Sequence, residues 1–144
     1  IQKNLLLIEP LIEARGLQLH YQVYACPVVR MHPFLADVLI SNLLSNAVRH
    51  NIESGDIKID LMSDILCIRN TGIAQPLEDD LFNRYRTRSH PEQGNGLGLS
   101  IVREICRTSG MHIHYHYAAP WHVFELHFQP VRIEDRITSQ MVQE

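Results

Sequence analysis

Apolar residues recur along the chain with two different spacings, and each spacing predicts one kind of element. Spacings of three and four residues predict three helices, over residues 1–16, 32–51 and 98–109. Alternation of apolar and polar residues predicts five strands, over residues 17–24, 56–62, 64–70, 111–117 and 122–128. The strands come mostly in hairpins rather than alternating with crossover helices. This order predicts an α+β fold, a two-layer α/β sandwich in which the helices lie on one face of the sheet.

Glycine and proline mark the ends of several predicted elements. Gly16 and Gly110 follow the first and last helices, at positions typical of a helix C-terminus. Pro33 falls in the first turn of the middle helix, where a missing N–H is tolerated. Pro10 lies inside the first helix and predicts a kink or a break there. Residues 71–95 have no clear periodicity, so we expect a loop.

Composition and charge narrow the class of protein. The 144 residues suit one domain, and 45% hydrophobic with 20% charged residues is ordinary for a globular protein. The formal charge of −3 argues against nucleic-acid binding, which usually requires a basic excess. No apolar run approaches the roughly 20 residues that span a bilayer. The scattered cysteines (Cys26, Cys67 and Cys106) contain no CxxC pair and favour neither a zinc site nor a structural disulfide.

Four polar residues fall on one stripe of the helix predicted over residues 32–51. Asn42 and Asn46 are four residues apart, and Arg49 and His50 come one turn later. An amide oxygen is a ligand that Mg²⁺ accepts together with water and phosphate oxygens, and arginine pairs with phosphate. The stripe alone is equally consistent with a partly solvated helix edge.

A glycine-rich run, "GNGLGLS" at residues 94–100, precedes the last predicted helix. Gly94, Gly96 and Gly98 would let the backbone approach an anion, which a helix N-terminus attracts through its N–H groups and dipole. The preceding segment carries a basic cluster that could fold over a bound nucleotide: Arg84, Tyr85, Arg86 and Arg88. A flexible surface turn beside a solvated basic loop is the alternative interpretation.

Three histidines alternate along the strand predicted over residues 111–117. His112, His114 and His116 therefore point to the same face of that strand. Histidine ladders can bind metals, but no fourth ligand is evident here. The apolar and aromatic residues between the histidines predict that the histidines face solvent.

Four segments, in one order along the chain, together resemble the catalytic ATP-binding domain of sensor histidine kinases. They are "NLLSNAVRHN" (42–51), "IRNTG" (68–72), "LFNRYR" (81–86) and "GNGLGLSIVREI" (94–105). They are similar to the asparagine box, the first glycine box, the phenylalanine box and the second glycine box of that family. The resemblance covers roughly residues 5–128 and is specific because the four segments agree.

The resemblance implies a fold and a division of the chain. Members of this family have the Bergerat-type ATP-binding fold. It is a two-layer α/β sandwich of a mixed, mostly antiparallel sheet packed on three helices, in which ATP lies between helices and a flexible lid loop. We therefore expect a lead-in helix over residues 1–16, an ATP-binding catalytic domain over 17–130 and a polar tail over 131–144. The larger family also contains gyrase, mismatch-repair and chaperone ATPases.

The resemblance also assigns roles to residues of this chain. Asn46 would hold Mg²⁺, with Asn42 beside the phosphates as a second candidate ligand, and Arg49 would contact phosphate; these three form the catalytic group. Asn70 would accept a hydrogen bond from the adenine amino group, Gly72 would give the ring room, and Phe82 would anchor the lid. The remaining expected nucleotide-binding residues are His50, Arg84, Tyr85, Arg86, Gly94, Gly96, Leu97 and Gly98.

The function implied is transfer of the γ-phosphoryl group of ATP, with Mg²⁺, to a histidine on a dimerisation domain outside this chain. The family implies a downstream response regulator, a homodimeric full-length protein, and an inner-membrane anchor with this domain on the cytoplasmic side. It implies no nucleic-acid partner, and we expect no membrane contact in this part. We expect the chain alone to bind nucleotide without phosphorylating itself.

Two alternatives remain open at the level of the sequence. A non-catalytic nucleotide-sensing or docking module with the same fold is favoured by Asn70, because the family usually has an aspartate there. An ATPase of the larger family is the other alternative. Asn42 argues against hydrolysis, since ATP-hydrolysing relatives carry a glutamate there and an amide cannot act as a general base.

Overall fold

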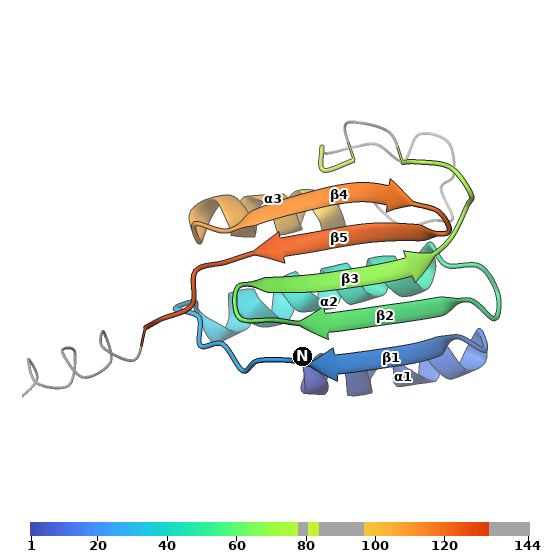
Figure 1. Cartoon of the computed structure of the whole chain (residues 1–144), viewed down its shortest axis with the longest axis horizontal. Coiled ribbons are helices and arrows are strands. Elements are labelled where there is room, and N and C mark those ends of the chain that lie inside the picture. Colours follow the sequence, from blue (N-terminus) through green and yellow to red (C-terminus); the bar gives the residue numbers. More distant parts are fainter. Residues whose placement is uncertain (78–80, 84–96, 133–144) are drawn as a thin grey trace, which may run out of the picture.

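The computed structural model describes residues 1–77, 81–83 and 97–132. This part of the chain contains three helices and five strands (Figure 1). In chain order they are α1 (Gln2–Ala14), β1 (Gln18–Val23), α2 (Pro33–Arg49), β2 (Asp56–Leu61), β3 (Ile65–Thr71), α3 (Gly98–Thr108), β4 (His112–Ala118) and β5 (Trp121–His127). All eight elements predicted from the hydrophobic pattern are present, each within a few residues of its predicted ends.

The strands form one sheet in the order β1-β2-β3-β5-β4. β1 and β2 are parallel and are joined by the crossover through α2, whereas the other three pairs are antiparallel. β3 therefore lies between β2 and β5, and β1 and β4 are the edge strands of the described sheet. The mixed, mostly antiparallel sheet predicted from the sequence is confirmed.

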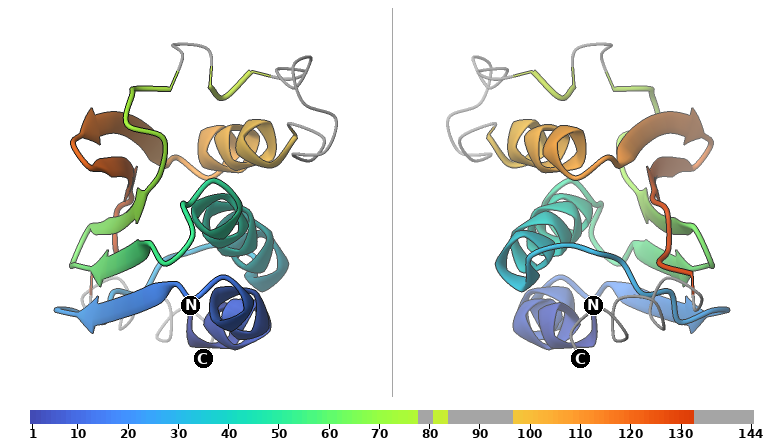
Figure 2. Two further views of the ribbon diagram at one scale, coloured as in Figure 1. Left: turned by 90° about the vertical axis from the view of Figure 1, so that its right-hand side faces the viewer. Right: turned by 90° about the vertical axis from the view of Figure 1, so that its left-hand side faces the viewer.

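The three helices lie side by side on one face of the sheet, which leaves the other face open (Figure 2). α2 occupies the middle and turns a continuous apolar stripe toward the sheet; Leu44 of this stripe is completely buried. Ile57 and Ile59 of β2 and Ile68 of β3 meet that stripe from the sheet side. The two-layer sandwich follows from these periodicities, since each layer has one apolar face to bury.

α1 runs beside α2 in the same direction. Near its start, Asn4 Nδ2 donates to Ser41 Oγ at 3.0 Å, and just past its end Arg15 donates to carbonyl groups at the end of α2. The helix continues through Pro10 without the break that we considered from the sequence. Pro10 and Leu6, the residue four positions before it, are both exposed, so water can solvate the carbonyl that loses its N–H partner.

A buried polar cluster closes the end of the sheet where α2 gives way to β2. The Thr71 hydroxyl donates to Asn51 Oδ1 at 2.6 Å and accepts from the Asp56 N–H at 2.8 Å. Asn51 Nδ2 donates to the Asp56 carbonyl at 3.0 Å. A Cβ at Gly55 would overlap both Asn51 Oδ1 and Thr71 Oγ1, so the cluster requires glycine there. These bonds tie the last residues of β3 to the segment that follows α2.

Three further predictions concern the surface and the chain end. His112, His114 and His116 are exposed on β4, as predicted. Gly110 has a φ of +66° just after α3, which confirms its position at the helix end. The predicted tail over residues 131–144 lies outside the described residues beyond Arg132. Among the described helices, none has the length and apolar character needed to cross a membrane.

Candidate functional site

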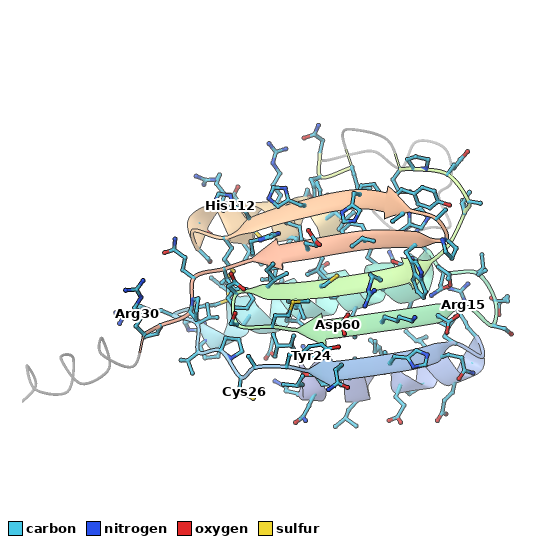
Figure 3. All side chains as sticks on the ribbon, in the orientation of Figure 1. Arg15, Tyr24, Cys26, Arg30, Asp60 and His112 are labelled. Atoms are coloured by element: carbon cyan, nitrogen blue, oxygen red, sulfur yellow. The ribbon has the colours of Figure 1, made fainter. Side chains whose placement is uncertain are left out.

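A pocket of about 310 Å³ opens between the C-terminal half of α2, the end of β3 and the segment that follows β3. α2 and the residues after it contribute Asn46, Arg49, His50 and Asn51, and the sheet contributes Asn70, His122 and Phe124. Ile73 and Leu77 of the following segment complete the wall together with Arg15. Figure 3 labels Arg15 at the end of α1, at the opposite end of the sheet from Tyr24 and Cys26.

The charges around the pocket favour an anion. Arg15 and Arg49 line it, and none of the described lining residues is a carboxylate, although the whole chain carries a net charge of −3. The pKa of His50 is lowered from its usual 6.5, first by desolvation in the pocket wall and then by the positive charges of Arg49 and Arg15. The pocket therefore combines positive groups with a histidine that the site holds in its neutral form.

Asn70 contributes a buried side-chain oxygen to the pocket wall. It is 1% exposed, and among the described residues its Oδ1 has no hydrogen-bond partner. The Nδ2 group donates to the Thr71 carbonyl at 2.9 Å, which orients the amide. A buried acceptor without a partner is costly and rare, and it commonly marks a site that a ligand completes. Such an acceptor is completed by any hydrogen-bond donor, an N–H or an O–H group.

Gly72 leaves no room for a side chain at the pocket wall. A Cβ there would lie 2.9 Å from His122 Cδ2 and 2.9 Å from the backbone carbonyl oxygen of His50. These distances are shorter than real Cβ contacts, and the carbonyl belongs to backbone that cannot move aside. The glycine thus lets the segment after β3 pack directly against His122.

Asn42 and Gly98 meet on the α3 side of α2. Asn42 Nδ2 donates to the Val38 carbonyl one turn earlier, at 2.8 Å. A Cβ at Gly98 would lie 2.9 Å from Asn42 Oδ1, so the glycine permits close approach of the two helices. Leu97 is the N-cap residue of α3, and its carbonyl accepts from the Ser100 hydroxyl at 2.8 Å. None of Asn42, Leu97 and Gly98 is among the residues that line the pocket.

The structure thus brings together part of the predicted site. Asn46, Arg49, His50 and Asn70 line one pocket, and Gly72 packs against its wall. Phe82 packs edge-on against Phe124, with ring centroids 6.3 Å apart. The other predicted residues, Arg84, Tyr85, Arg86, Gly94 and Gly96, lie outside the described part of the chain. No finding assigns a ligand to any of these residues, so their roles stay predictions.

Six lining residues were not predicted from the sequence: Arg15, Asn51, Ile73, Leu77, His122 and Phe124. Asn51 ends the segment "NLLSNAVRHN", so its place in that motif was the available signal. His122 reaches the pocket because β5 pairs with β3 in a register that sets it opposite Asn70. Hydrophobic periodicity does not specify which strands pair, and nothing local to His122 marks it.

The family and the fold are established by comparison with known proteins. The model of the family described as "Histidine kinase-, DNA gyrase B-, and HSP90-like ATPase" matches residues 33–133. The chain belongs to this family. Membership in an ATPase family makes ATP the expected ligand.

Curated relatives are sensor kinases. Sensor protein QseC of Salmonella typhi is 32% identical over 108 residues, which is 72% of this chain and 24% of that protein. Sensor histidine kinase HprS of Escherichia coli (strain K12) is 34% identical over 95 residues, 61% of this chain and 21% of that protein. The chain thus spans 24% or less of the length of these two relatives.

Among solved structures, the catalytic domain of histidine kinase ThkA is 25% identical. It superposes with a TM-score of 0.78, covering 90% of this chain and 89% of that one. The cytoplasmic segment of histidine kinase QseC has the same fold, with a TM-score of 0.69 over 90% of this chain and 72% of that one. The resemblance to histidine kinase catalytic domains and the expected fold are confirmed.

Proposed function

We propose that this domain binds ATP in the pocket and transfers the γ-phosphoryl group to a histidine on a helical dimerisation domain of a longer protein. The observation that carries the proposal is the composition of the pocket. Two arginines and no carboxylate line its described walls, beside apolar side chains and one buried amide oxygen without a partner. A nucleoside triphosphate combines the anion, the flat apolar base and the N–H donor that such a pocket accepts.

The base would lie against the sheet. Asn70 Oδ1 would accept a hydrogen bond from the adenine amino group, which satisfies the orphaned acceptor. Gly72 has no side chain that would take up space at the wall. Ile73, Leu77 and Phe124 offer apolar surface to the ring. An amide accepts this bond without charge, and a charge-assisted bond is roughly twice as strong. We therefore expect weaker nucleotide binding than a carboxylate at this position would give.

The phosphates would lie along α2. Asn46 and Arg49 both line the pocket within one helical turn, so an amide oxygen and a guanidinium face the same space. Asn46 would hold Mg²⁺, and Asn42, one turn earlier, is the second candidate ligand; this donor set suits a hard cation that retains water and phosphate oxygens. When bound, Mg²⁺ would neutralise charge on the phosphates. Arg49 would orient the same group.

Asn42 favours transfer over hydrolysis. Its Nδ2 is committed to the Val38 carbonyl, and its Oδ1 faces Gly98. An amide cannot remove a proton from water in the way that a glutamate does, so this position provides no general base. An acceptor histidine brings its own nucleophilic nitrogen and does not need that base.

Calorimetric titration with a non-hydrolysable ATP analogue tests the binding step. We expect saturable binding by the native chain that strengthens with Mg²⁺. Asn46→Ala should lose that Mg²⁺ dependence and bind about tenfold more weakly or worse, as loss of a metal-site group usually does. Ser45→Ala is the control, because Ser45 lies on the same helix and is not among the pocket residues. No binding by the native chain at millimolar nucleotide would refute the proposal.

The transfer step needs a second experiment, because a non-catalytic nucleotide-binding module is the competing candidate and Asn70 is the observation that favours it. The domain should be mixed with γ-labelled ATP, Mg²⁺ and a separately produced histidine-bearing helical dimerisation domain. Acid-labile label on that domain, absent when its histidine is replaced, is the expected result. Nucleotide binding without transfer would favour the module, and steady release of phosphate would favour an ATPase.

The cellular setting proposed follows from the kinase role. We propose a homodimeric full-length protein with an inner-membrane anchor, this domain on the cytoplasmic side and a response regulator as the next phosphoryl acceptor. The relatives named as sensor proteins support this setting. Crosslinking of the full-length protein in membranes, and transfer of label to a response regulator, would test it.

A further inference from the structure

A chain of hydrogen bonds joins β5, β4 and the segment after β3 beside the pocket. His122 is 3% exposed, and both of its ring nitrogens are engaged. Nε2 lies 2.9 Å from the Ile73 carbonyl oxygen, and Nδ1 lies 2.9 Å from the Tyr115 hydroxyl. The same hydroxyl accepts from the Leu77 N–H at 2.9 Å. One imidazole thus joins the β4–β5 hairpin to the segment after β3, which is distant from it in the sequence.

The partners determine where each proton lies. A carbonyl oxygen can only accept, so His122 must carry its proton on Nε2 and donate it to Ile73. Nδ1 is then an acceptor, and the Tyr115 hydroxyl donates to it while accepting from Leu77. Burial raises the pKa of Tyr115, which keeps its hydroxyl protonated and able to donate. Each of these three hydrogen bonds therefore has a defined donor and acceptor, and we call the chain that they form the relay.

The relay holds the segment that forms one wall of the pocket. Ile73 and Leu77, the two residues that it grips, both line the pocket, and so does His122 itself. His122 pairs with Asn70 across β3 and β5, so the gripped segment begins directly beside the unpaired amide oxygen. Gly72, between the two, allows the segment to lie flat on the imidazole.

We propose that His122 and Tyr115 are positioning residues for the nucleotide, which act by holding residues 72–77 in a preformed pocket wall. This proposal rests on the proposed binding of ATP in that pocket. A segment that is already ordered lowers the entropic cost of binding, so loss of the relay should weaken nucleotide affinity more than it affects the fold. The polar groups of both side chains are already hydrogen-bonded within the relay, so neither residue has to bind the nucleotide directly.

Tyr115→Phe is the test variant, and Tyr117→Phe is its matched control. Both tyrosines lie on β4 and both rings contact His122, with centroids 6.0 Å and 5.1 Å away. The Tyr115 hydroxyl makes the two relay bonds, whereas the Tyr117 hydroxyl makes no hydrogen bond in the described structure. Comparison of the two variants therefore distinguishes the effect of losing the relay bonds from the effect of losing any tyrosine hydroxyl beside His122.

Affinity for the ATP analogue with Mg²⁺ is the first readout. Tyr115→Phe should weaken binding between about twofold and tenfold, the range for one hydrogen bond, and Tyr117→Phe should leave it unchanged. His122→Gln, which can keep a donor near Ile73 but offers Tyr115 no aligned acceptor, should fall between native protein and Tyr115→Phe. Equal affinities for native protein and Tyr115→Phe would overturn the proposal.

The relay itself can be tested without nucleotide. Ring ¹⁵N spectra of the free protein should show His122 with one protonated and one unprotonated nitrogen, rather than the averaged signals of an exchanging imidazole. The Leu77 amide should exchange slowly in native protein and in Tyr117→Phe, and rapidly in Tyr115→Phe. Rapid exchange in native protein would overturn the relay. If the Leu77 amide exchanged slowly in native protein that binds no nucleotide, the proposed function would be refuted. The relay would then have a structural role only.

Discussion

At the scale of single residues, Gly72 shows how a missing side chain shapes the pocket. We expect Gly72→Ala to lower the free energy of unfolding by about 1–3 kcal/mol, because the new methyl group would overlap His122 and the His50 carbonyl. It should also weaken nucleotide binding, since both neighbours belong to the pocket region. Urea unfolding and calorimetric titration measure the two effects separately.

Gly110→Ala is the control for that variant. Gly110 has a φ of +66° with open space around it, so alanine there meets backbone strain of about 1 kcal/mol and no steric overlap. It should lower stability and leave nucleotide affinity unchanged. Native-like binding by Gly72→Ala would show that the close packing at this wall does not matter for the ligand.

His50 gives the pocket a dependence on pH. Its pKa in the folded protein lies below 6.5, so the unfolded chain takes up the proton first as the pH falls. The associated stability is fully present above pH 6.5 and is lost as the pH falls from 6.5 toward the lowered pKa of the folded state. His50→Asn should reduce the loss of stability between about pH 7 and about pH 5.

Nuclear magnetic resonance titration of His50 checks the sign directly. The free protein should show a midpoint below 6.5, and added nucleotide should raise that midpoint because phosphate charge favours the imidazolium. A midpoint at or above 6.5 in the free protein would contradict the desolvated setting of the ring.

At the scale of elements, Arg15 couples α1 to the end of α2. Its guanidinium donates to the carbonyl groups of Val48 and Arg49 in the last turn of α2 and of Asn51 just after it. Arg15→Ala should therefore lower the free energy of unfolding by about 1–3 kcal/mol, since it leaves carbonyl groups without their donor. It should also speed amide exchange in the residues around His50. Arg15→Lys should restore only part of both, because an ammonium lacks the planar fork.

Lys3→Ala is the matched control on the same helix. Lys3 pairs with Asp37 of α2 at 2.8 Å, but 74% of its side chain is exposed. Exposed pairs usually contribute between about 0 and 1 kcal/mol, so this variant should be nearly as stable as native protein. Equal losses for both variants would mean that Arg15 is an ordinary surface contact between the helices.

The elements were predictable because their information is local. Helical spacing on α2 and alternation on β2 and β3 record which side chains meet the core, so both kinds of element could be found without knowing the fold. Pro10 misled for the same reason, because only the structure shows that it lies on the exposed side of α1. Four of the predicted site residues line one pocket, and the sequence could single them out because the stripe on α2 and the motif around Asn70 are each contiguous in sequence.

At the scale of the whole molecule, the order of the strands was the information that the sequence lacked. β3 pairs with β5 rather than β4, and this choice alone brings His122 to Asn70 and Tyr115 to Leu77. Arg15 enters the pocket because α1 and α2 run side by side. Such long-range pairings depend on all the elements at once, so no local pattern encodes them.

The same strand order predicts how the sheet opens. β3 is hydrogen-bonded on both sides, whereas β1 and β4 are each bonded to one strand in the described sheet. Hydrogen exchange should therefore be slowest in β3, around Ile68, and faster along the edge strands. Protection along β4 equal to that along β3 would indicate a further partner at that edge.

The unpaired oxygen of Asn70 implies a conflict between durability and activity. Asn70 Oδ1 has no hydrogen-bond partner among the described residues, and a buried acceptor in that state costs about 1–3 kcal/mol, which a bound donor would relieve. Asn70→Val should make the free domain more stable by about 1 kcal/mol and weaken its affinity for ATP by about tenfold. Selection for robustness alone would therefore eliminate this asparagine, and its persistence in a working protein would reflect selection for the ligand. Thermal melts of native protein and Asn70→Val, each with and without nucleotide, would show whether the variant gains stability and loses nucleotide binding.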